Sequence, residues 1–320
     1  MNKTAFPKEI MAICIAALLT LPNIAVADDI EVAAEIGSIP PEILNVSKLR
    51  DNGDTENISA LDPEVEYLIK FTVRDNNSLA DLDTILVRVY ESTQSDQPVN
   101  KRRVYNFTYN ETANAWTASP SGYLNPSHTS TVPDNKSQVS FSFDLYFKLA
   151  GIAVPTGSTT NWIVSILVTD EDESTDLNDS TTFDVNEYRA LNSYTASFTW
   201  SGKNPGDILE NRTINPTITA NLQVDINTNG SDLTYGAYSI PVSSFHVYNS
   251  TGPLRTLSSS TLTVYDNYAE ASDSINPNIT GYTDAVEKTL KYDGAIPNPQ
   301  HSGTYDGTWT ISLADIINPA

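Results

Sequence analysis

Short segments in which apolar and polar residues alternate recur along the whole chain. The clearest places Val139, Phe141, Phe143, Leu145, Phe147 and Leu149 opposite Ser140, Ser142, Asp144, Tyr146 and Lys148. A period of two is typical of a strand with one face toward a core. Helical periodicity is almost absent, so we predict an all-β protein.

Residues 38–188 carry enough alternating segments for a complete antiparallel sandwich. Further strands are expected at Glu42–Ser47, Tyr67–Asp75, Asp83–Glu91, Arg103–Tyr109, Ala115–Ala118, Trp162–Thr169 and Thr181–Val185. Trp162–Thr169 should be buried on one face and half-buried on the other. Seven or eight strands in about 150 residues is the count of an immunoglobulin-like sandwich.

Residues 189–320 predict a second, separate β-sandwich domain. Strands are expected at Tyr194–Trp200, Ile218–Ile226, Ser243–Tyr248, Thr261–Tyr265, Val286–Tyr292 and Thr308–Leu313. The last of these lies near the chain end and could be lent to a neighbouring subunit, because a free sheet edge is a template for pairing.

The first 27 residues have the pattern of an export signal. Lys3 and Lys8 precede the apolar stretch Ile10–Leu21, and Ala25-Val26-Ala27 forms a cleavage site before the acidic leader 28–37. The only cysteine, Cys14, leaves with the signal, so the mature chain can form no disulfide. No second apolar run is long enough to span a membrane, and we expect a secreted, cell-surface protein.

The mature chain is strongly acidic. The full chain has 18 basic and 40 acidic residues. Removal of the signal leaves 16 basic and 39 acidic residues, a net charge of −23. Such a surface opposes binding to nucleic acid or anionic lipid and is compatible with divalent cations. A solvated acidic surface without any bound ion is the alternative.

Three short stretches give the first domain a family likeness. They are Pro40-Pro41-Glu42-Ile43-Leu44-Asn45-Val46-Ser47, then Phe71-Thr72-Val73-Arg74-Asp75 with Leu79-Ala80-Asp81-Leu82-Asp83, and Ile166-Leu167-Val168-Thr169-Asp170. In these three stretches, the chain resembles Ig-like domains of prokaryotic, particularly archaeal, cell-surface proteins. The turn Pro205-Gly206-Asp207 and the closing segment Ser302–Thr310 are similar to C-terminal β-domains of secreted archaeal surface proteins. The resemblance implies a structural or adhesive module, not a catalyst.

Two acidic loops of the first domain predict a calcium site. If the Ig-like topology holds, the loops after Phe71–Val73 and after Trp162–Thr169 lie at the same end of the sandwich. The candidate ligands are Asp75, Asp81, Asp83, Asp170, Asp172 and Asp176. Calcium takes six to eight oxygen ligands, and carboxylates of two loops could supply several. Loops of this composition also terminate strands without any ion.

Eleven N-x-S/T sequons lie in the mature chain, most of them in predicted turns. They begin at Asn45, Asn57, Asn76, Asn106, Asn110, Asn135, Asn178, Asn211, Asn229, Asn249 and Asn278. We expect N-glycosylation of several, although a chain this rich in Asn, Ser and Thr produces many sequons by composition alone.

No catalytic motif stands out. His128, His246 and His301 share no metal-ligand spacing, and thiol chemistry is excluded in a mature chain without cysteine. Exposed aromatic residues at Tyr105–Tyr109 and Trp116 could form a carbohydrate-binding face, or they could be sheet-on-sheet core.

We therefore expect a non-enzymatic structural subunit of a surface layer, sheath or filament. Its partners would be other surface proteins or copies of itself. An adhesin or carbohydrate-binding module that takes glycans is the alternative, and an exported hydrolase is the remote one.

Overall fold

The computed structural model describes residues 37, 39–133, 136–157, 160–194, 197–249, 252–265 and 285–315. The predicted signal and most of the acidic leader lie outside them. The described chain is all-β, with two short 3₁₀ turns, η1 (Leu79–Asp81) and η2 (Val242–Ser244). Among these residues no helix is long and apolar enough to cross a membrane.

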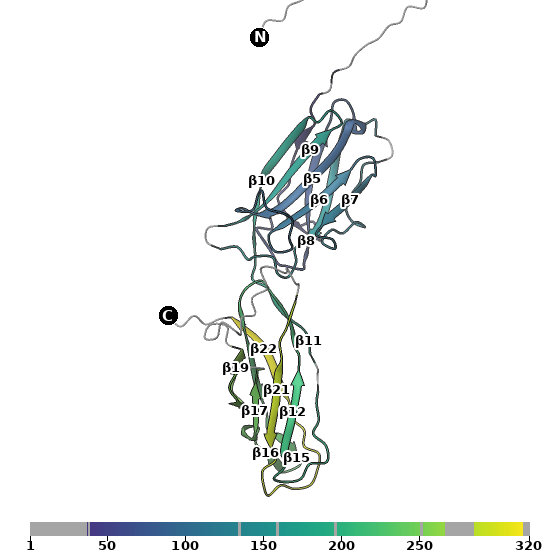
Figure 1. Ribbon diagram of the computed structural model, residues 1–320. Coiled ribbons are helices and arrows are strands. Elements are labelled where there is room, and N and C mark those ends of the chain that lie inside the picture. Colours follow the sequence, from purple (N-terminus) through teal and green to yellow (C-terminus); the bar gives the residue numbers. More distant parts are fainter. Residues whose placement is uncertain are drawn as a thin grey trace, which may run out of the picture. The chain divides into compact units, whose positions relative to one another are not determined.

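The first sandwich packs a four-stranded sheet on a six-stranded one (Figure 1). The smaller sheet contains β1 (Glu42–Leu44), β2 (Arg50–Asp51), β4 (Glu66–Arg74) and β8 (Ser140–Lys148). The larger runs in the order β3 (Ala60–Leu61), β10 (Thr175–Val185), β9 (Trp162–Asp170), β5 (Leu82–Glu91), β6 (Val104–Asn110) and β7 (Ala115–Ser119). Every pairing is antiparallel except that of β3 with β10.

The second sandwich is built from smaller sheets around its own core. One sheet orders β12 (Ile208–Ile214), β21 (Leu290–Ala295), β17 (Phe245–Tyr248) and β18 (Arg255–Thr256); another orders β19 (Leu262–Tyr265), β14 (Val224–Gly230) and β22 (Trp309–Asp315). A third joins β11 (Arg189–Ser193), β13 (Thr217–Ala220) and β20 (Val286–Glu287), and β15 (Leu233–Tyr235) pairs with β16 (Tyr238–Ile240). Predominantly antiparallel pairing in both sandwiches confirms the expected fold class.

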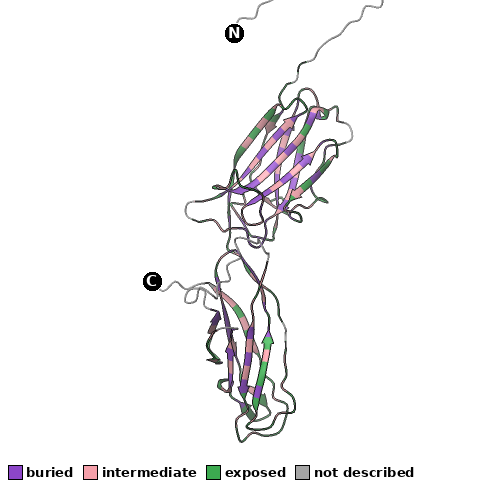
Figure 2. Cartoon of the chain, in the orientation of Figure 1, coloured by how far each residue is buried: buried purple, intermediate pink, exposed green. Residues whose placement is uncertain are grey.

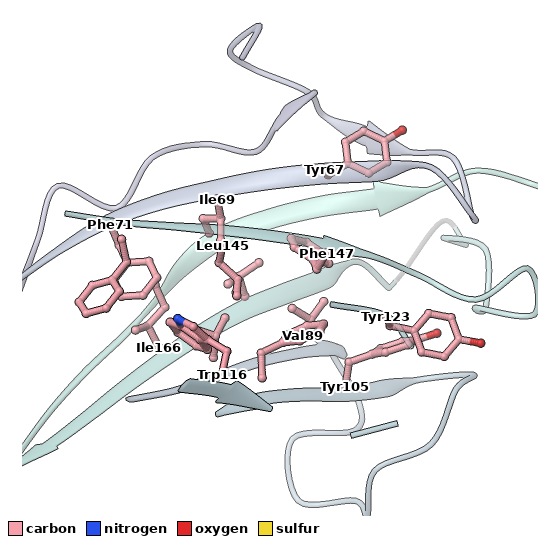
Figure 3. Packing of buried hydrophobic residues seen from close by; sticks show 14 of the residues in the cluster. Tyr67, Ile69, Phe71, Val89, Tyr105, Trp116, Tyr123, Leu145, Phe147 and Ile166 are labelled. Atoms are coloured by element: carbon pink, nitrogen blue, oxygen red, sulfur yellow. The ribbon is translucent and has the colours of Figure 1, made fainter. Parts of the chain in front are cut away.

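The alternation of buried and less buried residues along the strands determines which side chains form the core of the first sandwich. Residues of β9 switch between buried and half-buried at every step, as predicted from the sequence (Figure 2). Figure 3 shows side chains of β4 and β8, such as Phe71 and Leu145, facing Val89, Trp116 and Ile166 of the other sheet. Each fully buried aliphatic or aromatic side chain contributes about 1.5–3 kcal/mol.

The aromatic hairpin of the first domain belongs to this core. Tyr105, Phe107 and Tyr109 are fully buried and Trp116 is 9% exposed. The ring of Phe107 lies 5.5 Å from that of Phe147 on the facing sheet. The interpretation of these rings as a carbohydrate-binding face is therefore wrong.

Four sequence predictions differ from the structure in the second domain and in β10. Val286–Tyr292 is not one strand, because β20 (Val286–Glu287) pairs with β13 whereas β21 (Leu290–Ala295) pairs with β12 and β17. Ile218–Ile226 is not one strand but β13 and β14, separated at residues 221–223, because buried Asn221 turns the chain there. Its side chain accepts a hydrogen bond from the Tyr188 N–H and donates to the Asn186 carbonyl. The described part of Tyr194–Trp200 forms no strand. In contrast, β10 starts at Thr175, six residues before its predicted start.

Candidate metal centre

Three aspartates meet at one tip of the first sandwich. Carboxylate oxygens of Asp75, Asp81 and Asp170 all lie within 4.8 Å of one another. Asp75 is fully buried and Asp170 is 1% exposed, whereas Asp81 is half-buried. This is the meeting of the two acidic loops that the Ig-like topology predicts.

Asp75 is positioned by the end of β4. Its N–H donates to the Val139 carbonyl at 2.9 Å, which ties it to the segment leading into β8. Its Oδ1 accepts hydrogen bonds from the N–H groups of Asn77, at 2.8 Å, and Ser78, at 3.4 Å. These bonds fix the carboxylate, and the remaining oxygen, Oδ2, is buried without any hydrogen-bond partner.

Asp81 and Asp170 are brought together by the other sheet. Leu82 of β5 pairs directly with Asp170 of β9, and the Glu171 N–H donates to the Asp81 carbonyl at 2.8 Å. Buried Leu79 anchors the turn η1, which presents Asp81. Asp170 Oδ1 accepts from the Ser174 N–H at 2.7 Å and so closes the four-residue turn after β9. Asp81 Oδ2 is, like Asp75 Oδ2, buried and unpartnered.

The electrostatics of this tip are unfavourable without a cation. No basic side chain of the described residues forms an ion pair with Asp75 or Asp81. Burial raises the pKa of Asp81, and the negative charges of Asp75 and Asp170 raise it further, with smaller effects of Asp172 and Glu171. Buried like charges are stable only if protonated or neutralised by a cation.

The geometry suits a calcium ion. Two oxygens bound to one Ca²⁺ at 2.3–2.6 Å can lie at most about 5 Å apart, which the three carboxylates satisfy. Ca²⁺ also accepts carbonyl and water oxygens, so three carboxylates need not complete the shell. Asp75, Asp81 and Asp170 would hold the ion and join the two sheets at this end.

The other three predicted ligands lie outside this group. Asp83 occupies the irregular position between Leu82 and Thr84 of β5, and its side chain is exposed. Asp172 is exposed in the turn after β9. Asp176 lies in β10, not in a loop, and its Oδ2 accepts a hydrogen bond from the Ile43 N–H at 2.7 Å. It anchors the edge strand β1 instead.

The sequons differ strongly in accessibility. Exposed asparagines are Asn45, Asn57, Asn76 and Asn211; half-buried ones are Asn106, Asn110, Asn178 and Asn229. Asn249 is 2% exposed, and its side chain donates to the Val264 carbonyl and accepts from the Gly252 N–H. Asn135 and Asn278 lie outside the described residues.

Each histidine has a separate local partner. His128 lies 3.2 Å from a carboxylate oxygen of Glu66, and His246 lies 3.1 Å from one of Asp293. His301 stacks on the ring of Tyr238 with centroids 4.2 Å apart. The structure therefore does not combine them into one site.

Comparison with known proteins does not assign this chain to a family. No protein-family model matches the chain, and no curated protein matches it. Its similarity to the CsuC–CsuE chaperone-tip adhesion subunit pre-assembly complex, from archaic chaperone-usher Csu pili of Acinetobacter baumannii, has a TM-score of 0.31 at 10% identity. That alignment covers 80% of this chain and 96% of the other.

A second solved structure is less similar. BcpA, the major pilin subunit of Bacillus cereus, has a TM-score of 0.24 at 10% identity, over 80% of this chain and 56% of the pilin. Because both TM-scores lie below 0.5, neither likeness assigns a function to this chain. The comparisons give no support to an archaeal origin.

When a chelator removes any bound cation, we expect the free energy of unfolding to depend on pH because of the carboxylate cluster. It should fall as the pH rises from 3.8, the ordinary pKa of an aspartate, through the raised pKa of Asp81. The folded state then binds more protons than the unfolded state, so raising the pH favours unfolding. Urea unfolding in EDTA at several pH values would measure this. Asp81→Asn should flatten the slope relative to wild type, whereas exposed Asp83→Asn should leave it unchanged; equal slopes in all three would contradict the expectation.

Proposed function

We propose that the protein is a non-enzymatic, exported structural subunit of a cell-surface assembly, stiffened by Ca²⁺ at one tip of its first sandwich. The observation that carries this proposal is the buried group of Asp75, Asp81 and Asp170 with two unpartnered carboxylate oxygens. A bound cation there would cross-link β4 of one sheet to β5 and β9 of the other. The site would then contribute stability and not chemistry.

The proposed location rests on the sequence of the mature chain. An export signal and a net charge of −23 for the mature chain suit an environment outside the cell. Millimolar calcium is the range in which extracellular modules with weak sites operate, about 10⁻⁴–10⁻³ M. A protein that lacks disulfides gains from such a metal link.

Electron microscopy of the purified mature chain, with Ca²⁺ and with EDTA, tests the structural role. We expect ordered filaments or sheets in calcium and shorter or fewer assemblies in EDTA. A chain that remains monomeric at every concentration in both conditions would contradict a structural assembly. Saturable binding to a glycan array by such a monomer would favour an adhesin instead.

Glycans, if attached, should follow the accessibility of the sequons. We expect mass spectrometry of the native protein to find modification at exposed sites such as Asn57 and Asn211 and none at Asn249. The reason is that Asn249 would have to leave two hydrogen bonds and a buried position to accept a sugar. Occupancy of Asn249 equal to that of Asn57 would contradict this expectation.

A further inference from the structure

A groove runs along one side of the second sandwich. Its volume is about 530 Å³, and its walls come from both sheets, among them Leu209 of β12, Phe245 of β17 and Trp309 and Ile311 of β22. Within the described chain, β22 pairs along its whole length with β14 and has no strand on its other edge. A groove with both apolar and polar walls therefore adjoins an open sheet edge.

The segment that lines the groove does not close the sheet. Phe198 and Trp200 are half-buried, and their rings lie 5.5 and 6.1 Å from that of Trp309. Residues 197–203 make no backbone-to-backbone hydrogen bond with other described residues. Side chains attach the segment to β12 instead: Trp200 donates to the Glu210 carbonyl, and Arg212 donates to that of Thr199. The edge of β22 thus keeps its capacity to accept a strand.

The acidic leader has the sequence of such a strand. Ile30, Val32, Ala34 and Ile36 alternate with Glu31, Ala33 and Glu35. This segment of seven residues contains neither proline nor glycine and is as long as β22, which also has seven residues. Added to a sheet edge, it would bury its apolar side chains in the groove and leave both glutamates in water.

The length of the leader favours a second copy as its source. The chain enters the first sandwich beside the acidic tip, where the Ile39 N–H donates to Asn77 Oδ1. It leaves by β10, whose eleven residues begin near that tip at Thr175 and end at Val185, roughly 35 Å away. Ten leader residues span at most about 34 Å, which is about the length of the first sandwich. A leader that ran along its own first sandwich would therefore have no residues left to enter the groove of its own second sandwich.

We propose that residues 30–36 of one mature chain add as a strand to the free edge of β22 in a second copy. The contact is head-to-tail, and such heterologous contacts generate open chains unless the rotation closes a ring. This inference deepens the proposed structural role by naming the contact between subunits, and it does not depend on calcium. It reverses the expectation that the closing strand is lent to a neighbour, because β22 is paired within its own sheet and acts as the acceptor.

Two neighbouring substitutions in the full mature chain test the proposal. Val32→Asp places a charge on the apolar face of the leader, and Ala33→Asp places the same charge on the opposite face. Analytical ultracentrifugation with Ca²⁺ and with EDTA should show that Val32→Asp weakens assembly about tenfold to a hundredfold, the loss expected for one buried valine. Ala33→Asp should assemble like wild type.

A synthetic peptide of residues 28–38 separates the possible occupants. We expect it to bind the Val32→Asp chain saturably, with a change in tryptophan fluorescence, and to shorten wild-type assemblies by occupying their grooves. A peptide with Val32→Asp should do neither. Equal assembly of both chain variants, or no binding of the peptide, would overturn the proposal. A wild-type chain that stays monomeric and excludes the peptide would show that each leader occupies its own groove, which would overturn the choice of a second copy.

The same samples keep this inference distinct from the metal site. Assemblies that persist in EDTA and disappear in Val32→Asp would support the strand contact while leaving calcium unneeded for assembly. Assemblies that need calcium but tolerate Val32→Asp would support the structural role and overturn the strand contact.

Discussion

Saturating Ca²⁺ should raise the unfolding midpoint of the first sandwich by about 5–10 °C, and Asp75→Asn should remove most of that rise. A ligand at a hundred times its dissociation constant stabilises the folded state by about 2.7 kcal/mol, which corresponds to this shift in a domain of about 150 residues. Differential scanning calorimetry of the mature chain with Ca²⁺ or EDTA would measure it.

The choice of an asparagine substitution for Asp75 separates ligand loss from structural damage. Its amide side chain would keep an oxygen to accept the N–H groups of Asn77 and Ser78, which now bond to Asp75 Oδ1. The substitution would also remove one of the like charges that raise the pKa of Asp81. In EDTA we therefore expect Asp75→Asn to be at least as stable as wild type, while its response to calcium disappears.

Asp83→Asn is the matched control for charge. Asp83 is exposed and lies outside the three-carboxylate group, so its variant loses the same charge but no ligand oxygen. It should respond to calcium as wild type does. A calcium response of equal size in Asp75→Asn and Asp83→Asn would exclude the site, and a similar response to Mg²⁺ would exclude selectivity for calcium.

The sequence predicts the first sandwich well because its strands alternate strictly. Tyr67, Ile69, Phe71 and Val73 are all buried, as their positions at every second residue of β4 require. The pattern fails at both extremes: Val139, just before β8, is 49% exposed although it follows the same alternation, and Leu68, at an alternate position of β4, is fully buried. Alternation sets the face of a residue, but the neighbouring sheet decides whether that face is covered.

The candidate metal ligands show what a loop sequence cannot specify. Six aspartates satisfy the same local description, yet only the three at the ends of β4, η1 and β9 converge. Asp176 is withdrawn by an interaction with Ile43, which is 133 residues away in sequence. Asp83 is turned outward by an irregularity in the pairing of β5 with β9. Both outcomes depend on strand register between distant segments, which one sequence does not reveal.

The second sandwich was predicted less accurately for a related reason. Tyr194–Trp200 has the alternation of a strand, but Phe198 and Trp200 are drawn toward Trp309 and Tyr292 while their backbone remains unpaired within the described chain. Burying aromatic rings and forming backbone hydrogen bonds with a neighbouring strand are two separate conditions. The alternation in the sequence indicates only the burial of the rings.

Phe107→Ala should destabilise the first sandwich by about 3–5 kcal/mol, the usual cost of removing a fully buried aromatic ring. Phe107 is 0% exposed and packs on Phe147 across the sheet interface, so its removal leaves a cavity between the two sheets. Chemical denaturation in EDTA would measure the change without a contribution from bound calcium.

Tyr235→Ala is the matched control for loss of an aromatic ring. Tyr235 is 42% exposed in the hairpin of β15 and β16, where substitutions away from the core usually change stability by less than about 0.5 kcal/mol. A large loss in Phe107→Ala with a small one in Tyr235→Ala would establish that the aromatic hairpin holds the sandwich together. A Phe107→Ala variant as stable as wild type would contradict this role of the ring in the core.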